Sequence, residues 1–163
     1  IQRKGQSFAI EAMLHLPEAR LALIGEGEDR PMLEKLAHEL GVADRVHFLG
    51  SLPHQQIAQY LQAADVAVLP SSSEGLANAW IEALACGAPL VITDAGGARE
   101  VLTSEAAGRI VERTPEAIAT AVHELMAHPA HRETIAATVA SYSWEANGAA
   151  LVAHWRHLVG NPC

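Results

Sequence analysis

Short apolar runs alternate along the chain with longer segments in which apolar residues recur every three or four positions. Short apolar runs between turn residues are typical of strands buried on both faces, and the longer spacing is typical of helices that cover such strands. The predicted strands are residues 20–25, 45–50, 65–69, 89–93 and 108–111. The predicted helices are residues 7–16, 29–40, 53–64, 74–86, 97–102, 115–127, 129–142 and 144–159.

The alternation of strands and helices predicts an α/β protein with a Rossmann-like, doubly wound parallel sheet and extra C-terminal helices. No internal repeat or linker interrupts the 163 residues, so we take residues 1–163 as one domain. The chain opens directly into a helix, whereas the first strand of a doubly wound sheet lies in its middle. We therefore expect a fragment of a longer protein whose first strand precedes residue 1, with a gap between strands 21–24 and 66–69.

Composition narrows the class of protein. The residues are 50% apolar, 4% aromatic and 18% charged, which is typical of a soluble globular domain. A net charge of −8 without any Lys/Arg-rich run argues against a nucleic-acid-binding face, and no apolar run is long enough to span a membrane. Cys86 and Cys163 are too few for a disulfide framework, so we expect both as thiols in a reducing compartment.

Two carboxylates, Glu74 and Glu82, lie between two predicted strands, in the region where open α/β sheets bind their ligands. Glu82 belongs to an otherwise apolar helical run at 79–85, where an unpaired charge is costly. Its partner is a ligand such as a ribose diol, an arginine such as Arg99, or water at an exposed edge. The sequence leaves these three alternatives open.

The segment between the third strand and Glu82 has the residues of an anion site. The serines at 71–73 can cap a helix, and Gly75 permits close approach of a ligand. In a helix that starts here, the amides of residues 75–78 would point outward at the positive end of the helix dipole. An ordinary helix N-cap without a ligand is the alternative interpretation.

Two further glycine turns follow predicted strands. Gly25 and Gly27 follow the first strand, and Gly96 and Gly97 follow the fourth. Each pair fits either a turn that contacts a ligand or a plain turn between a strand and a helix. The first loop lacks the third glycine of a dinucleotide fingerprint, which disfavours a Rossmann-type NAD domain.

Signatures of metal and nucleophile chemistry are weak. His128 and His131, like His154 and His157, are three residues apart on helices, but no carboxylate or cysteine completes a ligand set near either pair. No serine nucleophile elbow and no Cys–His pairing stands out. We therefore expect no metal site.

Taken together, these features resemble one protein family. The matching segments are residues 3–5, 23–27, 45–50, 65–71, 74–75, 82–87, 96–97, 100, 108 and 142–144. They resemble the C-terminal lobe of family 4 glycosyltransferases (glycosyl transferases group 1), which are retaining enzymes of the GT-B fold. The two glutamates with seven residues between them, followed by alanine and glycine, are the signature of that family.

The resemblance implies a role for each matching residue. Lys4 would contact the donor diphosphate, Glu74 would face the sugar hydroxyls or the reacting centre as the catalytic candidate, and Glu82 would hold the ribose diol. The other donor-binding residues that it implies are Gly25, Gly27, Gly75, Leu76, Ala77, Asn78 and Phe48, the last within a base-pocket lining at 48–52.

The same resemblance implies a hexosyltransferase-type enzyme that moves a sugar from a nucleotide-diphosphate sugar to an acceptor without a cofactor or metal. The acceptor, a glycan, a lipid or a small molecule, would be bound by an N-terminal lobe that this chain lacks, so we expect the chain alone to be inactive. The full-length protein is expected in the cytoplasm, either free or at the inner face of the membrane.

Two other functions remain open. One is a stand-alone or regulatory module that binds nucleotide sugars. The other is a nucleotide-sugar epimerase or phosphorylase of the same fold, which the two glutamates together with Gly96 and Gly97 disfavour. The last helix, at 144–159, resembles the segment that crosses back onto the other lobe. In the chain alone, its apolar face is either exposed or used for dimerisation.

Overall fold

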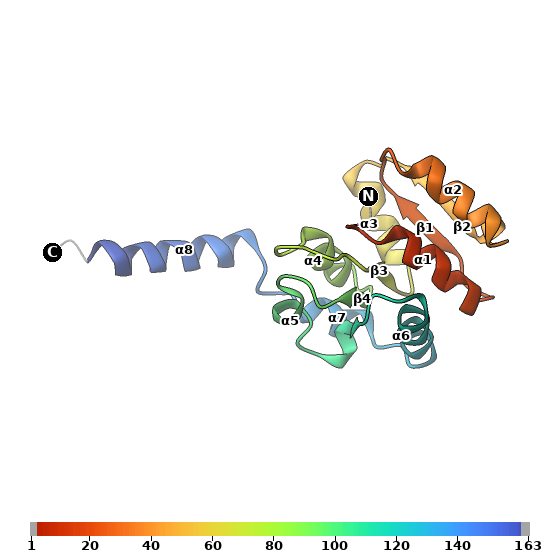
Figure 1. Ribbon diagram of the computed structural model, residues 1–163. Coiled ribbons are helices and arrows are strands. Elements are labelled where there is room, and N and C mark those ends of the chain that lie inside the picture. Colours follow the sequence, from red (N-terminus) through yellow and green to blue (C-terminus); the bar gives the residue numbers. More distant parts are fainter. Residues whose placement is uncertain (1–2, 161–163) are drawn as a thin grey trace.

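The computed structural model describes residues 3–160 and contains every predicted strand and helix (Figure 1). The strands are β1 (Leu21–Ile24), β2 (Val46–Gly50), β3 (Ala67–Leu69), β4 (Leu90–Thr93) and β5 (Gly108–Val111). The helices are α1 (Gln6–Ala12), α2 (Arg30–Glu39), α3 (His54–Ala63), α4 (Asn78–Ala85), α5 (Ala98–Val101), α6 (Pro115–Ala127), α7 (Arg132–Ala137) and α8 (Trp144–Val159). Short 3-10 turns are η1 (Met13–His15), η2 (Ala43–Arg45) and η3 (Glu105–Ala107).

All strand pairs are parallel, which confirms the predicted α/β class. β1 pairs with β2, and β3, β4 and β5 form a second sheet in that order. Within residues 3–160, no strand pairing joins the two sheets. β1 and β3 are therefore not hydrogen-bonded to each other, in agreement with the gap expected between them.

β4 is the centre of the larger sheet, and all four of its residues are buried. Leu90 and Ile92 pack in a cluster with Ile135 of α7, whereas Val91 packs in another with Ile118 of α6. Successive side chains of a strand point to opposite faces, so this alternation means that helices cover both faces of the sheet. Burial of each such aliphatic side chain contributes about 1.5–3 kcal/mol, which makes β4 the anchor of this half.

The β1–β2 half is less enclosed. Its buried cluster includes Ile10 of α1, Leu33 of α2 and Val46 of β2. The residues of β1 are intermediate or exposed and those of β3 are intermediate, in contrast to the buried residues of β4. Helix α1 contacts both α2 and α6, and so connects the two halves.

Helix α8 projects from the rest of the described chain (Figure 1). Ser143 caps it, because the Ser143 Oγ accepts a hydrogen bond from the Ala146 amide at 3.1 Å. None of its residues is buried. Its exposed apolar residues are Trp144, Leu151, Val152, Trp155, Leu158 and Val159. Of the two expectations for this apolar face, exposure is the one seen in the single chain.

Three predicted helices differ from the structure by three residues or more at one end. The helix predicted at 7–16 ends as α1 at Ala12 and is followed by the 3-10 turn η1. α7 ends at Ala137 and starts at Arg132, so it is shorter at both ends than residues 129–142. α4 starts at Asn78, four residues later than predicted, for a reason that lies in the candidate site. Across residues 3–160, no helix is both long enough and apolar enough to cross a bilayer.

Candidate functional site

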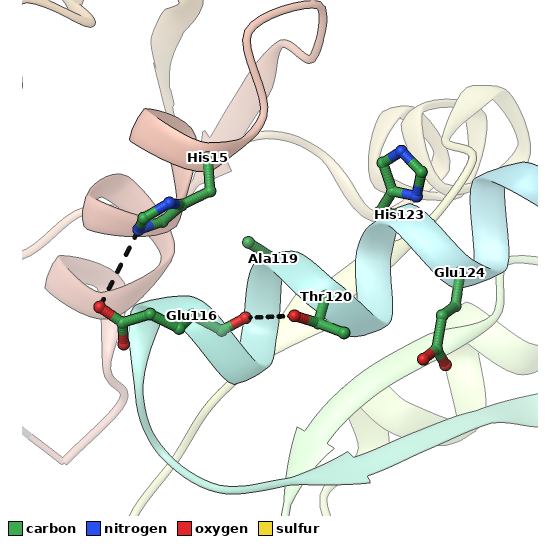
Figure 2. Close-up of a pocket in the computed structure, with 6 residues that line it drawn as sticks. All are labelled: His15, Glu116, Ala119, Thr120, His123 and Glu124. Carbon is green, nitrogen blue, oxygen red and sulfur yellow. Dashed lines mark hydrogen bonds and ion pairs between the residues drawn. The ribbon is translucent and has the colours of Figure 1, made fainter.

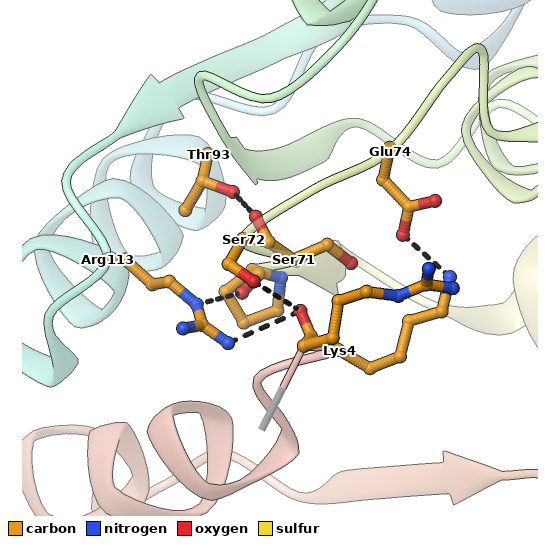
Figure 3. Close-up of polar contacts among 8 residues, drawn as sticks. Lys4, Ser71, Ser72, Glu74, Thr93 and Arg113 are labelled. Atoms are coloured by element: carbon orange, nitrogen blue, oxygen red, sulfur yellow. Dashed lines mark hydrogen bonds and ion pairs between the residues drawn. The ribbon is translucent and has the colours of Figure 1, made fainter. Parts of the chain in front are cut away.

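Polar groups gather where the strands of the larger sheet end (Figure 3). The loop before α1 carries Lys4, the loop after β3 carries Glu74, and Arg113 lies just beyond the end of β5. The carboxyl ends of parallel strands share one edge of a sheet, so residues that are distant in the sequence meet there. This edge is where the sequence predicted a ligand site.

Lys4 and Glu74 form the closest ion pair of this region. The Lys4 Nζ donates a hydrogen bond to the Glu74 Oε1 at 2.6 Å. The Glu74 side chain is 11% exposed, whereas the Lys4 side chain is 47% exposed. Glu74 is therefore held within the loop, and Lys4 retains a face toward solvent. The structure thus brings together the two residues to which the resemblance assigned the diphosphate and the sugar.

The surroundings of Glu74 favour its ionised form. Burial alone would raise the pKa of this carboxyl, but hydrogen bonds from Lys4 and Ser71 and the charges of Lys4 and Arg3 outweigh burial and lower the pKa below 4.5. Glu74 is consequently a carboxylate at neutral pH. It can accept hydrogen bonds from hydroxyl groups or stabilise positive charge nearby.

The loop after β3 extends further than the sequence predicted. We expected a helix from residue 74 with serine caps, but Asn78 is the first helical residue and no side chain caps α4. The Gly97 amide instead donates to the Gly75 carbonyl at 3.0 Å, and a Cβ on Gly96 would lie 2.2 Å from the Glu74 carbonyl oxygen. Packing against this glycine turn holds Glu74 and Gly75 outside the helix. The expectation that the amides of 75–78 begin a helix is therefore wrong.

Four hydrogen bonds fix the ends of the loops that carry Lys4 and Glu74. Thr93, the last residue of β4, is buried, and its hydroxyl donates a hydrogen bond to the Ser71 carbonyl. The Ser72 amide donates to the Arg3 carbonyl at 2.8 Å. Arg113 Nε donates to the Pro70 carbonyl at 2.7 Å, and its Nη2 donates to the Arg3 carbonyl at 3.3 Å (Figure 3). The two loops are thus tied together through their backbones.

Gly5 lets the first loop come this close. Its φ is +74°, and a Cβ at this position would lie 2.2 Å from the Pro70 carbonyl oxygen. Any other residue would therefore force the loop away from the end of β3. The sequence pattern Arg-Lys-Gly at 3–5 is explained by this contact, because the glycine lets the lysine stand beside Glu74.

Glu82 is more open than the sequence suggested. Its side chain is 39% exposed, and its Oε1 lies 3.4 Å from the Nε2 of His54, the first residue of α3. Arg99, which we had considered as its partner, instead pairs with Asp94 through hydrogen bonds of 2.7 and 3.0 Å. The partner of Glu82 is therefore a histidine, and its exposed carboxylate remains accessible to a ligand.

The other predicted donor-binding residues surround the carboxyl ends of β1 and β2. The Gly25 amide donates to the Gly50 carbonyl at 2.8 Å, and the φ of Gly25 is +124°. A Cβ on Gly25 or Gly27 would meet no atom within 4 Å. The half-buried ring of Phe48 packs against the core, with the Arg30 guanidinium 5.8 Å from its centroid. These residues therefore form a second group, on the smaller sheet, whose roles remain predictions.

The last three of the predicted residues lie between Gly75 and the body of α4. Leu76 is 48% exposed. Ala77 is the N-cap residue of α4, and Asn78 is its first residue. They connect the Glu74 loop to Glu82 on α4, which places the two glutamates on one continuous segment.

A surface depression elsewhere carries titratable groups (Figure 2). It lies between η1 and α6 and is lined by His15, Glu116, Ala119, Thr120, His123 and Glu124. The His15 Nε2 and the Glu116 Oε1 are 3.9 Å apart. None of these residues belongs to the candidate site. Within residues 3–160, no group of three or more His, Cys, Asp or Glu side chains is placed to hold a metal ion. The expectation of metal-free chemistry remains a prediction.

Sequence reasoning missed three residues around this site: Thr93, Arg113 and His54. Thr93 ends β4 and Arg113 follows β5, so the rule that carboxyl ends carry ligand sites could have drawn attention to both. Their hydrogen bonds go to backbone carbonyls, which carry no sequence signal. His54 follows Pro53 at the start of α3, and its approach to Glu82 depends on the packing of α3 against α4.

Comparison with known proteins identifies the family. Residues 1–141 match the glycosyl transferases group 1. A GDP-mannose-dependent alpha-(1-6)-phosphatidylinositol monomannoside mannosyltransferase of Mycolicibacterium smegmatis is 35% identical over 156 residues, which cover 88% of this chain and 40% of the relative.

Solved structures agree with this match. Sucrose-phosphate synthase from Thermosynechococcus elongatus superposes with a TM-score of 0.86 at 31% identity, and the match covers 98% of this chain and 43% of the synthase chain. The Anabaena protein HepE, solved in complex with UDP, has a TM-score of 0.76 and 25% identity, covering 87% of this chain and 41% of its own.

The chain thus spans about 40% of the length of the curated relative from Mycolicibacterium smegmatis. The match extends over the loops that carry Lys4 and Glu74 and over helix α4, which carries Glu82. The structural likeness extends over nearly the whole chain. The chain belongs to the glycosyl transferases group 1 family, and its parallel α/β fold is that of the family's GT-B glycosyltransferases.

Proposed function

We propose that this chain is the donor-binding lobe of a retaining, hexosyltransferase-type enzyme that transfers a sugar from a nucleotide-diphosphate sugar to an acceptor. The observation that carries the proposal is the 2.6 Å contact between Lys4 and Glu74 at the carboxyl ends of the strands, on the segment that leads to Glu82. The UDP complex of the relative HepE supports a nucleotide donor.

Lys4 is suited to bind the leaving diphosphate. Cleavage of the bond between the sugar and the diphosphate leaves additional negative charge on the phosphate oxygens. An ammonium group stabilises that charge through charge-assisted hydrogen bonds, and it does so without a metal ion. Lys4 is fixed at its backbone by the Ser72 amide on the preceding carbonyl, yet 47% of its side chain is exposed and can reach a ligand.

Glu74 is suited to the sugar side of the same bond. The carboxylate is ionised because Lys4, Ser71 and Arg3 lower its pKa despite its burial. A fixed carboxylate can accept hydrogen bonds from sugar hydroxyls, and it favours positive charge that develops at the anomeric carbon. We assign Glu74 one of these two roles, and both require the carboxylate form.

Glu82 is suited to hold the ribose. A carboxylate accepts two O–H donors at once, which fits a 2′,3′-diol. Its side chain is 39% exposed, and its contact with His54 is long, at 3.4 Å, so a ligand can reach the carboxylate without breaking a strong pair. The remaining predicted residues, Gly25, Gly27, Gly75, Leu76, Ala77, Asn78 and Phe48, would complete the donor site around the phosphates and the base.

We further propose that residues 1–163 are one domain of a longer enzyme. Among the described residues, β1 and β3 each pair with one strand only, β2 and β4, so each leaves an edge that a further strand of the enzyme could pair with. The unpaired edges and the half-exposed apolar residues of both strands support such a strand. The exposed apolar residues of α8 would be covered by a second lobe that binds the acceptor.

The location and the acceptor follow from this proposal. The enzyme would act in the cytoplasm, free or at the inner face of the membrane, on a glycan, lipid or small-molecule acceptor. The isolated chain would bind a nucleotide but transfer no sugar, because the second lobe supplies the acceptor.

A nucleotide titration tests the proposed function. The isotope-labelled chain would be titrated to millimolar UDP, GDP and ADP, and binding would be followed by calorimetry and by NMR shifts of the amides at 3–5 and 74–82. We expect one nucleotide to bind and Glu82→Ala to weaken it about tenfold or more, the effect of losing hydrogen bonds to a charged group.

The matched control is Glu124→Gln. Glu124 is also a partly exposed carboxylate with a weak partner, Arg109 at 3.5 Å, and it lies on α6 outside the site. This variant should bind the nucleotide as the unmodified chain does. A folded chain that binds none of the three nucleotides at millimolar concentration would contradict the proposed function.

A further inference from the structure

Arg113 occupies a position that none of the assigned donor-binding roles explains. It follows β5 and is half-buried. Among the described residues, its guanidinium contacts Pro70, Arg3 and Phe8. Its Nε donates to the Pro70 carbonyl at 2.7 Å and its Nη2 donates to the Arg3 carbonyl at 3.3 Å. Its guanidinium carbon also lies 4.7 Å from the centroid of the Phe8 ring on α1.

These three contacts surround the two loops of the candidate site. Pro70 immediately precedes the serines that lead to Glu74, and Arg3 immediately precedes Lys4. The Arg3 carbonyl also accepts from the Ser72 amide at 2.8 Å, so it is shared by Arg113 and the Glu74 loop. Arg113 therefore connects the backbone next to Lys4 with the backbone at the end of β3.

A guanidinium is well suited to this function. Its donors lie in one plane in a fixed geometry, so that one side chain can hold two carbonyls at a set distance while its face stacks on an aromatic ring. Lys4 needs such support, because its own side chain is half-exposed and has four rotatable bonds. The contact of its Nζ with Glu74 depends on where its backbone lies.

We propose that Arg113 is a positioning residue, which clamps the Arg3 and Pro70 carbonyls and thereby sets the contact between Lys4 and Glu74. This role rests on the proposed function of Lys4 and Glu74 in donor binding. Arg113 itself would not touch the donor. It would hold the cation and the carboxylate in place before the donor arrives, so that binding does not have to order the loop.

The first test follows the ionisation of Glu74, which depends on the Lys4 contact and needs no ligand. Burial raises the pKa of Glu74, and Lys4, Ser71 and Arg3 lower it. NMR detection of the Glu74 side-chain carboxyl across the acid pH range would give its pKa in the unmodified chain and in Arg113→Met. We expect the pKa of Glu74 to rise in Arg113→Met, because Lys4 is no longer held beside it.

Arg113→Lys separates position from charge. Lysine keeps the positive charge but cannot hold two carbonyls with a planar fork. The positioning role predicts that Arg113→Lys raises the pKa of Glu74 in the same direction as Arg113→Met, by a smaller amount. If Arg113→Lys titrates as the unmodified chain and only Arg113→Met shifts, the effect is one of charge alone and the proposal is overturned.

Arg45→Met is the matched structural control. Arg45 is also half-buried and donates to backbone carbonyls, at 2.7 Å to Leu16 and 3.0 Å to Met13, away from the site. It should lower the melting temperature as Arg113→Met does but leave the titration of Glu74 unchanged. An equal shift in Arg45→Met would show general loosening and would overturn the proposal.

Nucleotide affinity gives the second readout. Arg113→Met should lower the affinity for the nucleoside diphosphate that binds the unmodified chain by about tenfold, because Lys4 loses one charge-assisted contact with it. If Arg113→Met does not fold, Phe8→Leu removes the ring under the guanidinium and should shift the pKa of Glu74 in the same direction by less. An unshifted Glu74 in a folded Arg113→Met or Phe8→Leu variant would contradict the proposal.

The two readouts separate this inference from the proposed function. If the unmodified chain binds no nucleotide but Glu74 shifts in the Arg113 variants, the proposed function fails and the positioning of the Lys4–Glu74 pair stands. If nucleotide binding is unaffected by Arg113→Met and Glu74 does not shift, the positioning role fails and the proposed function stands.

Discussion

The two glutamates of the candidate site differ in how firmly the protein holds their side chains. Glu74 is 11% exposed and pairs with Lys4 at 2.6 Å, whereas Glu82 is 39% exposed and lies 3.4 Å from a histidine. The loops around Glu74 are tied by Thr93, Ser72 and Arg113. Glu82 is carried by one helix, and its side chain is held only weakly.

This difference matches the chemistry that each end would perform. Charge that develops in a reaction is best stabilised by groups that are already in place, because moving them during the reaction would cost free energy. A ribose diol carries no charge and can be held by a carboxylate that exchanges water for the ligand. We therefore interpret the Lys4–Glu74 end as the preorganised end and the Glu82 end as the end that the ligand completes.

The largest expected effect comes from breaking the glycine turn under Glu74. In Gly96→Ala, the new Cβ would lie 2.2 Å from the Glu74 carbonyl oxygen, at a φ of +54°. We expect a loss of about 3 kcal/mol or more in the free energy of unfolding, from the clash and the unfavourable backbone conformation. Chemical denaturation measures this loss.

Gly41→Ala is the control for that change. The φ of Gly41 is +70°, but a Cβ there would meet no atom within 4 Å. It should lose only about 1 kcal/mol, the cost of the left-handed conformation for alanine. Equal losses in the two variants would mean that the Gly96 turn does not support the Glu74 loop.

The second effect separates the two ends by ligand. Lys4→Met should lower the affinity for a nucleoside diphosphate about 10- to 100-fold, which is the effect of losing a hydrogen bond to a charged group. It should lower the affinity for the matching nucleoside monophosphate less. Glu82→Gln should weaken both nucleotides by the same factor, because the ribose is common to them. Calorimetric titration of each pair gives the four affinities.

Lys35→Met provides the matched control, since Lys35 is the other lysine of the chain and pairs with Glu39 on α2 at 3.4 Å. Its exposed helical pair contributes at most about 0.5 kcal/mol to stability and nothing to the ligand site. If Lys4→Met weakened monophosphate and diphosphate equally, Lys4 would not be a diphosphate contact.

The third effect is a pH dependence of stability. The pKa of Glu74 in the folded chain is lowered, so its contribution is fully present above the ordinary value of 4.5 and is lost as the pH falls through the folded value. The difference in unfolding free energy between the unmodified chain and Glu74→Gln should therefore shrink as the pH drops below about 4.5.

Asp94 does not contribute to the measured difference in unfolding free energy. Its pKa is also lowered, by its hydrogen bond to Arg99, but it is present in both proteins and cancels in the difference. Urea unfolding at several acid pH values gives the difference directly. A difference that stays constant with pH would show that Lys4 does not stabilise the Glu74 carboxylate.

The smallest effect probes the Glu82 end. Burial, and after it the charge of Glu82, raises the pKa of the Cys86 thiol. Glu82→Gln should lower the pKa of Cys86 and so increase the rate of its alkylation at mildly alkaline pH by less than about threefold. The rate would be measured in a Cys163→Ser background, so that one cysteine reacts. An unchanged rate would place Glu82 too far from Cys86 to affect it.

The fold could be predicted closely where local chemistry marks the ends of elements. α6 has the predicted bounds, with Pro115 in its first turn and the Thr114 hydroxyl accepting from the Ala117 amide. α8 likewise begins after the Ser143 cap. In both cases a polar side chain satisfies amides that the helix itself leaves unpaired, and such a signal is readable in sequence.

The start of α4 could not be predicted in this way. The serines at 71–73 have the residue types of a cap, but the Gly96–Gly97 turn binds the Gly75 carbonyl and keeps the segment out of the helix. That turn lies about twenty residues later in the chain, so no local pattern reveals it. A tertiary contact here overrides a local preference.

The candidate site was predictable in its charged residues but not in its supports. Lys4 and Glu74 follow from their places in the family pattern, and the structure adds that they touch. Arg113 acts on backbone carbonyls that are far from it in sequence, and a contact of that kind leaves no trace in residue spacing. The pairing of Arg99 with Asp94 rather than Glu82 was likewise decided by packing.

The most direct test of the central claim is a double-mutant cycle in which the ribose 2′-hydroxyl of the ligand and the Glu82 carboxylate are removed separately and together. The affinity of the chain for the nucleoside diphosphate that it binds would be compared with its affinity for the 2′-deoxy form, in the unmodified chain and in Glu82→Gln. We predict that removing the 2′-hydroxyl weakens binding about tenfold in the unmodified chain and has almost no effect in Glu82→Gln, because both changes remove the same hydrogen bond. Equal losses in the two proteins would show that Glu82 does not hold the ribose, and would contradict the account of a donor site.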